Sequence, residues 1–395
     1  MGDEPRDVEV VRLRGSSWDH PRGHAPMVAT AAAYHDGTAG RVSIEWVVRS
    51  LREFGMLSVQ ELAHRFDLVV IDHPHIGTMA ESGCVVPLDD FVDADTWATI
   101  AANSPGGSHE SYHYGGHQWA FAIDAACQTS AWRPDRLSSP PTTWEQVFTL
   151  AQGGRVMWPL CAVDAAASFM TLTVERGEEC ARTDEYFVSR DVGRWALATM
   201  YDVARPSDPQ CLVANPIQVL DAMAEGDDVT YSPLTFCYVN YSRDEHLGRH
   251  RVAFGNIPAL DGRSGPRGAL LGGAGLAISA TSDAVMDAVA YATYVASAPV
   301  QNGLYYRAGG QPAHAAAWSN PSLDEPSGHF FSGVAPVLEK SWTRPTGPGF
   351  ASFQNAMIEL FAEWYDHAPA PTTFLDKLDE LYRSSLATDP ARVRH

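Results

Sequence analysis

The sequence predicts a two-lobe α/β protein, and three observations support this fold class. The chain has 395 residues, which is longer than a single hydrophobic core usually serves, so two domains are expected. Strand-like and helix-like segments alternate through its first third, as they do where helices cover a parallel sheet. A strand-like segment at 268–279 indicates that the chain builds a second α/β layer and then returns to the first.

The opening third supplies the first layer. "VEVVRL" (8–13), "RVSIEWVV" (41–48) and "DLVVID" (67–72) read as strands, and the last is continuously apolar, as a buried parallel strand should be. Helices are predicted between them at 26–37 and 58–66. In the first of these helices we expect the proline of "PMVATAAAYHDG" near the start and its glycine just past the end.

The second layer begins with a long strand-like run at 117–132 and then becomes mostly helical. "TTWEQVFTLA" contains Thr142 with Glu145 three residues later, the spacing of a helix capping box. A later helix has Asn215 as its predicted cap and Pro216 at its first position. The helices predicted in this part of the chain are 162–177, 188–204, 216–225 and most of the segment from 282 onward.

Two crossings between the layers predict a hinge with an interlobe cleft. We expect lobe 1 to comprise residues 1–125 plus 275–330, and lobe 2 to comprise 126–274 plus 331–395. The glycines of "LLGGAGLAIS", which include Gly273, suit a hinge bend or a close approach of the backbone.

Composition excludes several classes of partner. The net charge is −20 and no segment gathers Lys and Arg, which argues against nucleic acid and anionic membranes. No apolar run is long enough for membrane insertion. The six scattered cysteines form no C-x-x-C pair and are expected to be buried apolar residues rather than disulfides or zinc ligands. We predict a monomer without a cofactor.

The N-terminus, "MGDEPRDVEV", is polar and acidic and lacks the basic start and apolar middle of an export signal. The expected location is therefore cytoplasmic for the chain as written, or extracytoplasmic if a signal peptide was removed from it.

Polar and aromatic groups follow two of the predicted strands. Trp18, Asp19 and His20 follow the first strand, and His73 and His75 follow the third. If these strands are neighbours, both clusters lie at the carboxyl edge of the sheet, where α/β proteins bind their ligands. We therefore predict that they line the cleft.

Each side chain type suits a small polar ligand. The indole of Trp18 offers a flat face for a sugar or aromatic ring, Asp19 can accept hydrogen bonds from hydroxyls, and Arg22 can hold a carboxylate in bidentate fashion. The alternative is local: Asp19 caps a helix or pairs with Arg22.

A metal site is a competing hypothesis. The clusters after the two strands contain enough imidazoles and carboxylates to bind a metal ion. In "HESYHYGGH", His109, His113 and His117 lie four apart, which on a helix would place them on one face. The two glycines of that segment make a helix improbable, so we predict no metal site.

Further ligand-binding candidates are spread over both lobes. Asp124 and Gln128 are polar residues four apart on the predicted crossing strand, and they need partners, either a ligand or other groups of the hinge. Aromatic residues end several segments of lobe 2, where they close over a ligand or simply bury their rings. The remaining candidates are Trp158, Tyr231 and Tyr238 from lobe 2, the backbone around Gly273, Gln311 in "AGGQP", and Arg344 as an anion partner.

A succession of segments gives the chain a family resemblance from about residue 8 to 385. These segments are "DLVVIDHPHIG", "CVVPLDDF", "TTWEQVFTLA", "NPIQVLDAMAEGD", "LLGGAGLAIS" followed by "DAVAYATYVASAPVQ", and "AGGQPAH". They resemble the carbohydrate-type extracellular solute-binding proteins of ABC transporters, the maltose-binding-protein-like family. The resemblance implies a periplasmic-binding-protein-like fold, closure over a small ligand, and docking to an ABC permease.

The leading hypothesis is a solute-binding protein whose lobes close over a sugar, polyol or sugar acid. Two alternatives use the same scaffold: a cytoplasmic enzyme of lyase, isomerase or cyclase type, with His20 and Asp72 as acid–base groups, and a cytoplasmic ligand sensor. The sequence has no nucleophile-elbow, P-loop or H-E-x-x-H motif, so we do not expect an enzyme.

Overall fold

The computed structural model describes residues 10–50, 58–245, 247–260, 265, 267–367 and 370–387. They form two compact units, and the two-lobe α/β fold class is confirmed. Unit 1 comprises Met1–Ser104, Tyr112–Ala125 and Ala274–Ala317, and unit 2 comprises Pro105–Ser111, Ala126–Gly273 and Trp318–His395. The sequence assigned residues 105–111 and 318–330 to lobe 1, whereas they belong to unit 2, and it assigned residue 274 to lobe 2, whereas it belongs to unit 1.

A sheet forms the centre of unit 1. Strand β1 (Val11–Trp18) pairs in parallel with β2 (Val42–Arg49) on one side and with β3 (Leu68–Ile71) on the other. The predicted parallel layer is therefore confirmed for these three strands. Strand β9 (Leu271–Ile278) pairs with β3 in the antiparallel sense, from Gly275 to Ile278.

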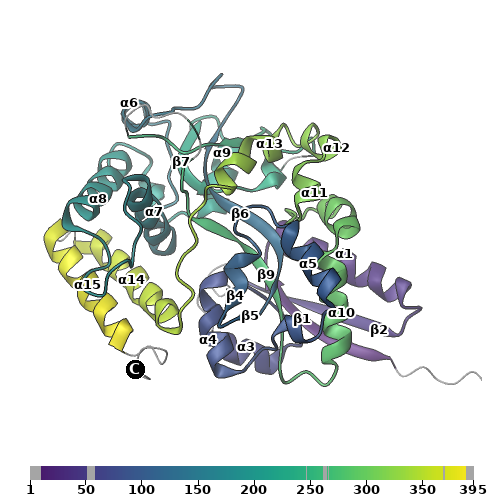
Figure 1. The fold of residues 1–395 in the computed structure, drawn as a ribbon. Coiled ribbons are helices and arrows are strands. Elements are labelled where there is room, and N and C mark those ends of the chain that lie inside the picture. The colour runs from purple at the N-terminus through teal and green to yellow at the C-terminus, as the bar shows by residue number, and fades with distance from the viewer. Residues whose placement is uncertain are drawn as a thin grey trace, which may run out of the picture. The chain divides into compact units, whose positions relative to one another are not determined.

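Helices cover this sheet, as Figure 1 shows for α1 and α10. Helix α1 (Pro21–Gly37) packs on β2, on α10 (Val285–Ala296) and on a π-helical turn, η6 (Val300–Tyr305). Residues of these elements meet in one apolar core that includes Trp18, Met27, Leu68, Tyr291 and Tyr305. The other segments that the structure describes in unit 1 are α3 (Val59–Arg65), η1 (His73–His75), α4 (Ile76–Ser82), η2 (Leu88–Asp90), α5 (Ala94–Ala102), β4 (His113–Tyr114), β5 (His117–Gln118) and most of α11 (Ala315–Trp318).

Two helix starts differ from the sequence prediction. Helix α1 begins at Pro21 rather than near Pro26, because the side chain of His20 accepts the backbone N–H of Arg22 and caps it. The capping box of α6 (Trp144–Gln152) uses Thr143 with its N3 residue Gln146, one position later than the predicted pair of Thr142 and Glu145.

Unit 2 combines strand pairs with a helical bundle. Strand β6 (Phe121–Trp132) enters it from unit 1 and pairs there with β7 (Tyr231–Phe236) and β8 (Ala253–Gly255), both antiparallel. Four helices pack against one another: α7 (Ala162–Glu175), α8 (Arg190–Ala204), α14 (Pro348–His367) and α15 (Pro371–Ala387) (Figure 1). The other segments of unit 2 are η4 (Pro209–Leu212), α9 (Pro216–Glu225), η5 (Val239–Tyr241), α12 (Pro321–Asp324) and α13 (Phe330–Leu338).

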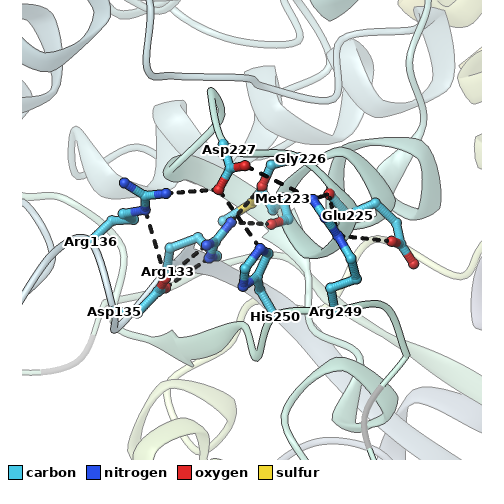
Figure 2. Close-up of polar contacts among 9 residues, drawn as sticks. All are labelled: Arg133, Asp135, Arg136, Met223, Glu225, Gly226, Asp227, Arg249 and His250. Atoms are coloured by element: carbon cyan, nitrogen blue, oxygen red, sulfur yellow. Dashed lines mark hydrogen bonds and ion pairs between the residues drawn. The ribbon is translucent and has the colours of Figure 1, made fainter.

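A buried arginine joins the end of β6 to the end of α9, as Figure 2 shows. The fully buried guanidinium of Arg133 donates to the carbonyl oxygens of Met223 and Gly226, at 2.8 and 2.7 Å. Its other nitrogens donate to both carboxylate oxygens of Asp135, at 2.8 Å each. A cation at this place stabilises α9, because the last carbonyls of a helix lack partners within the helix.

Within the ranges that the structure describes, none of the helices has the length and apolarity needed to cross a membrane.

Candidate functional site

The predicted neighbours β1 and β3 are paired in the sheet, with Gly15 opposite Leu68 and Ser16 opposite Val69. Because the two strands are parallel, the segments that follow them lie at the same edge of the sheet. This edge is the candidate site of unit 1. The sequence prediction that the two clusters share one edge is thus confirmed by the strand pairing.

Most aromatic and imidazole groups at this edge are buried. Trp18 is 5% exposed and belongs to the core of unit 1, and the first turn of α1 lies directly on its ring. A Cβ at Gly23 would come within 2.3 Å of the indole, so this close approach requires glycine. The hydroxyl of Ser17 donates to the carbonyl of Gly23 at 2.8 Å and holds the turn in place.

Asp19 differs from its neighbours because it is exposed. Its backbone N–H donates to the carbonyl of Arg49 at 2.6 Å, and in the described part of the chain its carboxylate has no hydrogen-bond or ion-pair partner. The alternative prediction, that Asp19 caps α1 or pairs with Arg22, is wrong, since His20 is the cap and Arg22 pairs with Asp124. Asp19 thus offers free acceptor oxygens at the carboxyl edge of the sheet.

Arg22 and Asp124 form a buried ion pair within unit 1. Nε of Arg22 donates to one carboxylate oxygen of Asp124 at 2.7 Å, and Nη2 donates to the other. The side chains are 4% and 1% exposed. Burial raises the pKa of Asp124, while the guanidinium of Arg22 opposes that rise. The fork of Arg22 therefore holds a carboxylate of this protein.

His20 is held neutral beside this pair. It is 7% exposed, and its Nδ1 accepts the N–H of Arg22 at 3.0 Å. Burial, with a smaller contribution from the charge of Arg22, lowers the pKa of His20 to about 4. Since Nδ1 is an acceptor, the ring proton lies on Nε2 at neutral pH.

The segment after β3 is a tight 3-10 turn. Asp72 caps it and is partly exposed, and its carboxylate accepts the N–H of His73 at 2.8 Å. His73 is fully buried, with Nδ1 at 3.2 Å from the same carboxylate and its ring edge-on to Tyr112 at 6.3 Å between centroids. His75 is 8% exposed.

Tyr305 is a polar group at this site that the sequence did not single out. It is fully buried in the core of unit 1, and among the described residues its hydroxyl has no hydrogen-bond partner. Burial raises its pKa, and the charge of Asp124 adds to that rise while the charge of Arg22 opposes it. The segment "GLYYRAGGQP" contains this tyrosine, but its spacing did not indicate a role.

Gln311 lies in the same unit, and its side chain is hydrogen-bonded to β6 instead of being exposed. Its Nε2 donates to the carbonyl of Ala125 at 2.7 Å, and its side chain is fully buried. Asp124 forms an isolated bridge with Pro312.

The candidates of unit 2 lie mostly in its interior. Trp158 is fully buried, stacks on Trp144 at 5.6 Å and donates to Ser168 at 3.0 Å. Gln128 accepts the hydroxyl of Thr171, and its Nε2 lies 3.5 Å from Ser168. The remaining candidates are Tyr231 (fully buried), Tyr238 (6% exposed), Gly273 (φ 103°, in β9) and Arg344, which donates to Gln354 at 3.0 Å.

The structure thus gives the location of each of the fourteen candidates, and their roles in ligand binding stay predictions. Trp18, Asp19, His20, Arg22, His73, His75, Asp124 and Gln311 belong to unit 1, and Gln128, Trp158, Tyr231, Tyr238, Gly273 and Arg344 belong to unit 2.

The histidine-rich segment is a 3-10 turn, η3 (Glu110–Tyr112), followed by a hairpin, and not one helix. β4 and β5 pair in the antiparallel sense, and Gly115 and Gly116 turn the chain with φ of 62° and 88°. Within the described ranges one group could hold a metal ion, Asp89, Asp90 and His117. His117 Nδ1 lies 2.9 Å from Asp89, which also accepts the N–H of Gln118 at 3.0 Å, so Asp89 anchors the hairpin.

Comparison with known proteins identifies a family for the chain. Residues 56–323, more than half of its length, match the family model described as bacterial extracellular solute-binding protein. A comparison with curated protein sequences finds no match.

Several solved structures share the fold. A solute-binding protein of an ABC transporter from Agrobacterium radiobacter K84, in complex with ribitol, has a TM-score of 0.79 at 18% identity and covers 95% of this chain and 99% of its own. The GacH receptor of Streptomyces glaucescens, solved without ligand and with acarbose, has a TM-score of 0.78 at 15% identity, covering 96% and 99%. A solute-binding protein from Thermotoga lettingae, bound with α-D-tagatose, has a TM-score of 0.79 at 14% identity, covering 95% and 100%.

Proposed function

The chain belongs to the family of bacterial extracellular solute-binding proteins, and from this premise we propose that its ligand is a small polyhydroxylated molecule. Sugars, polyols and sugar acids form this class. The structures of similar fold carry ribitol, tagatose and acarbose, which all present many hydroxyls. Family membership does not favour the alternatives of an enzyme or a ligand sensor.

One observation carries the proposal for unit 1: the exposed carboxylate of Asp19 follows β1 at the carboxyl edge of the sheet, and the partly exposed Asp72 follows the neighbouring strand β3 at the same edge. Carboxylates accept hydrogen bonds from sugar hydroxyls without a change of protonation at neutral pH. In this proposal the buried Trp18, His20, Arg22 and Asp124 hold the edge in shape, and Asp19 contacts the ligand.

The proposed partner is an ABC permease, which receives the ligand outside the cytoplasmic membrane. The family is extracellular, which supports this location. The residues 1–9, on which most of the prediction about an export signal depends, lie outside the described residues. The monomeric state remains a prediction.

Calorimetric titration and thermal unfolding with ribitol, tagatose, maltose and acarbose test the proposal. A true ligand at a hundred times its dissociation constant should stabilise the fold by about 2.7 kcal/mol. Asp19→Asn should weaken its binding about tenfold or more, because a charge-assisted hydrogen bond is lost. The matched control is Asp36→Asn, an exposed aspartate near the end of α1, which should bind normally.

Two results would contradict the proposal at different levels. If no sugar, polyol or sugar acid stabilises the protein, the ligand class is wrong. If a ligand binds equally well to the wild type and to Asp19→Asn, the class stands and the position of the site is wrong.

A further inference from the structure

Unit 2 contains a pocket that the proposed function does not use. Its volume is about 310 Å³, within the range of small-molecule sites. Helix α8, the turn η4 and helix α14 form it together with Leu160. None of the fourteen predicted ligand-binding residues lines it.

The walls of this pocket are apolar and partly open to water. Met200, Tyr201 and Leu212 contribute side chains from α8 and η4, and Trp364 contributes an indole from α14. Tyr201 is 50% exposed and Leu212 is 37% exposed, whereas Trp364 is 7% exposed. Covering apolar surface of this kind releases water and favours a ligand with an apolar body.

Arg205 is the charged residue of the lining. It directly follows α8 and is exposed, and among the described residues its guanidinium has no hydrogen-bond or ion-pair partner. Its acidic neighbour Asp208 uses its carboxylate to accept the N–H of Gln210 at 2.8 Å and caps η4. The hydroxyl of Ser207 donates to the carbonyl of Val203 at 2.6 Å. The formal charge of the lining is therefore that of Arg205, which has no partner in the part of the chain that the structure describes, and the hydroxyls of Tyr201 and Ser207 are its neutral polar groups.

We propose that this pocket binds a small carboxylate with an aromatic or branched apolar body, whose carboxylate pairs with Arg205. The planar guanidinium matches a carboxylate in bidentate geometry, and Trp364 and Tyr201 offer aromatic surface for the body. The concave shape favours a small molecule over a second copy of the chain. The site is separate from the proposed sugar site, and its ligand belongs to a different chemical class.

Calorimetric titration with three probes of one shape tests the charge preference: 3-phenylpropionate, 3-phenylpropanamide and 3-phenylpropylamine. We expect the carboxylate to bind tightest and the amine weakest. Arg205→Gln should weaken the binding of 3-phenylpropionate about tenfold and leave the amide unchanged, because one charged hydrogen-bonding partner is lost. Arg194→Gln, which removes an exposed arginine of α8 outside the pocket, is the control for the change in net charge.

A second pair of variants tests the position. Leu212→Glu places a negative charge in the lining, and Val213→Glu places it on the next residue, which is 66% exposed and does not line the pocket. Only Leu212→Glu should lose binding of 3-phenylpropionate, by tenfold or more. Both residues are exposed enough that neither variant should disturb folding, which circular dichroism checks.

Three outcomes would overturn the proposal. The first is the absence of saturable binding of 3-phenylpropionate at millimolar concentration. The second is an equal change in the affinity for 3-phenylpropionate in the two variants of a pair, either Arg205→Gln and Arg194→Gln or Leu212→Glu and Val213→Glu. The third is a concentration-dependent dimer, seen by light scattering, that Leu212→Glu disperses, since the occupant would then be a second copy of the chain.

Discussion

Strand β6 carries two buried polar side chains four residues apart, and the two units satisfy them by different means. Asp124, in unit 1, is paired with the guanidinium of Arg22. Gln128, in unit 2, is held by the hydroxyl of Thr171 and lies near that of Ser168. At these two positions of β6, unit 1 thus has a charge pair and unit 2 has neutral hydrogen bonds. The loss of one partner should therefore cost unit 1 much more than unit 2.

The two units also differ in how a buried titratable group at the start of a helix makes their stability depend on pH. His20, which caps α1 in unit 1, has its pKa lowered to about 4 by burial and by Arg22. Asp164, in the first turn of α7 in unit 2, has its pKa raised to about 7 by burial, which the thiol of Cys161 partly offsets. Burial disfavours the charged form in both cases, but the consequences for stability have opposite signs. As pH falls from 6.5 to 4, unit 1 loses stability through His20, whereas unit 2 gains stability through Asp164.

The largest expected effect is that of Asp124→Ala. It leaves the charge of Arg22 buried without its carboxylate and should cost unit 1 about 3–5 kcal/mol of unfolding free energy. Denaturant unfolding at pH 7 measures the loss, and hydrogen exchange of peptides from β1 and α1 locates it in unit 1. The double variant Arg22→Met with Asp124→Leu removes both charges and should recover much of the stability. A loss below about 1 kcal/mol in the single variant would contradict the importance of the ion pair.

The sequence was sufficient for the fold because the fold depends on patterns that local residue types reveal. The alternation of apolar strands with helices identified β1, β2 and β3, and Asn215 with Pro216 marked the start of α9 as the structure has it. The start of α1 was missed because its cap is His20, a residue type that is not typical of caps.

The environment of each candidate was harder to predict. The sequence predicted Trp18 in the loop after the first strand, whereas Trp18 is the last residue of β1. The sequence also could not show that Gly23 lets α1 cover the indole. It identified Arg22 as a carboxylate partner without showing that the carboxylate is that of Asp124, 102 residues away. Partners at such separation are set by the tertiary fold, which a single sequence does not report.

Asp164→Asn should sharpen the comparison through its dependence on pH. Between about pH 4 and the folded-state pKa of about 7, the folded protein keeps a proton on Asp164 that the unfolded chain has lost. The unfolding free energy therefore falls as pH rises through this window. Asp164→Asn, which cannot ionise, should be more stable than the wild type at pH 8 by on the order of 2–4 kcal/mol, and nearly equal to it at pH 4. A difference that is the same at both pH values in denaturant unfolding would show that Asp164 ionises normally.

Gln128→Leu should have the smallest effect of the three and should not depend on pH. It removes the acceptor of the Thr171 hydroxyl, at a cost of about 1–2 kcal/mol for a buried neutral group. Thr171→Val should cost more, because the same hydroxyl also accepts the N–H of Leu270 at 3.0 Å, and that donor would lose its partner. Both single variants remove the same hydrogen bond between Gln128 and Thr171. The double variant Gln128→Leu with Thr171→Val should therefore lose less unfolding free energy than the two single variants lose when added together. If Gln128→Leu lost as much unfolding free energy as Asp124→Ala, the loss would be larger than one neutral hydrogen bond explains. The contrast between a charge pair in unit 1 and neutral hydrogen bonds in unit 2 would then be wrong.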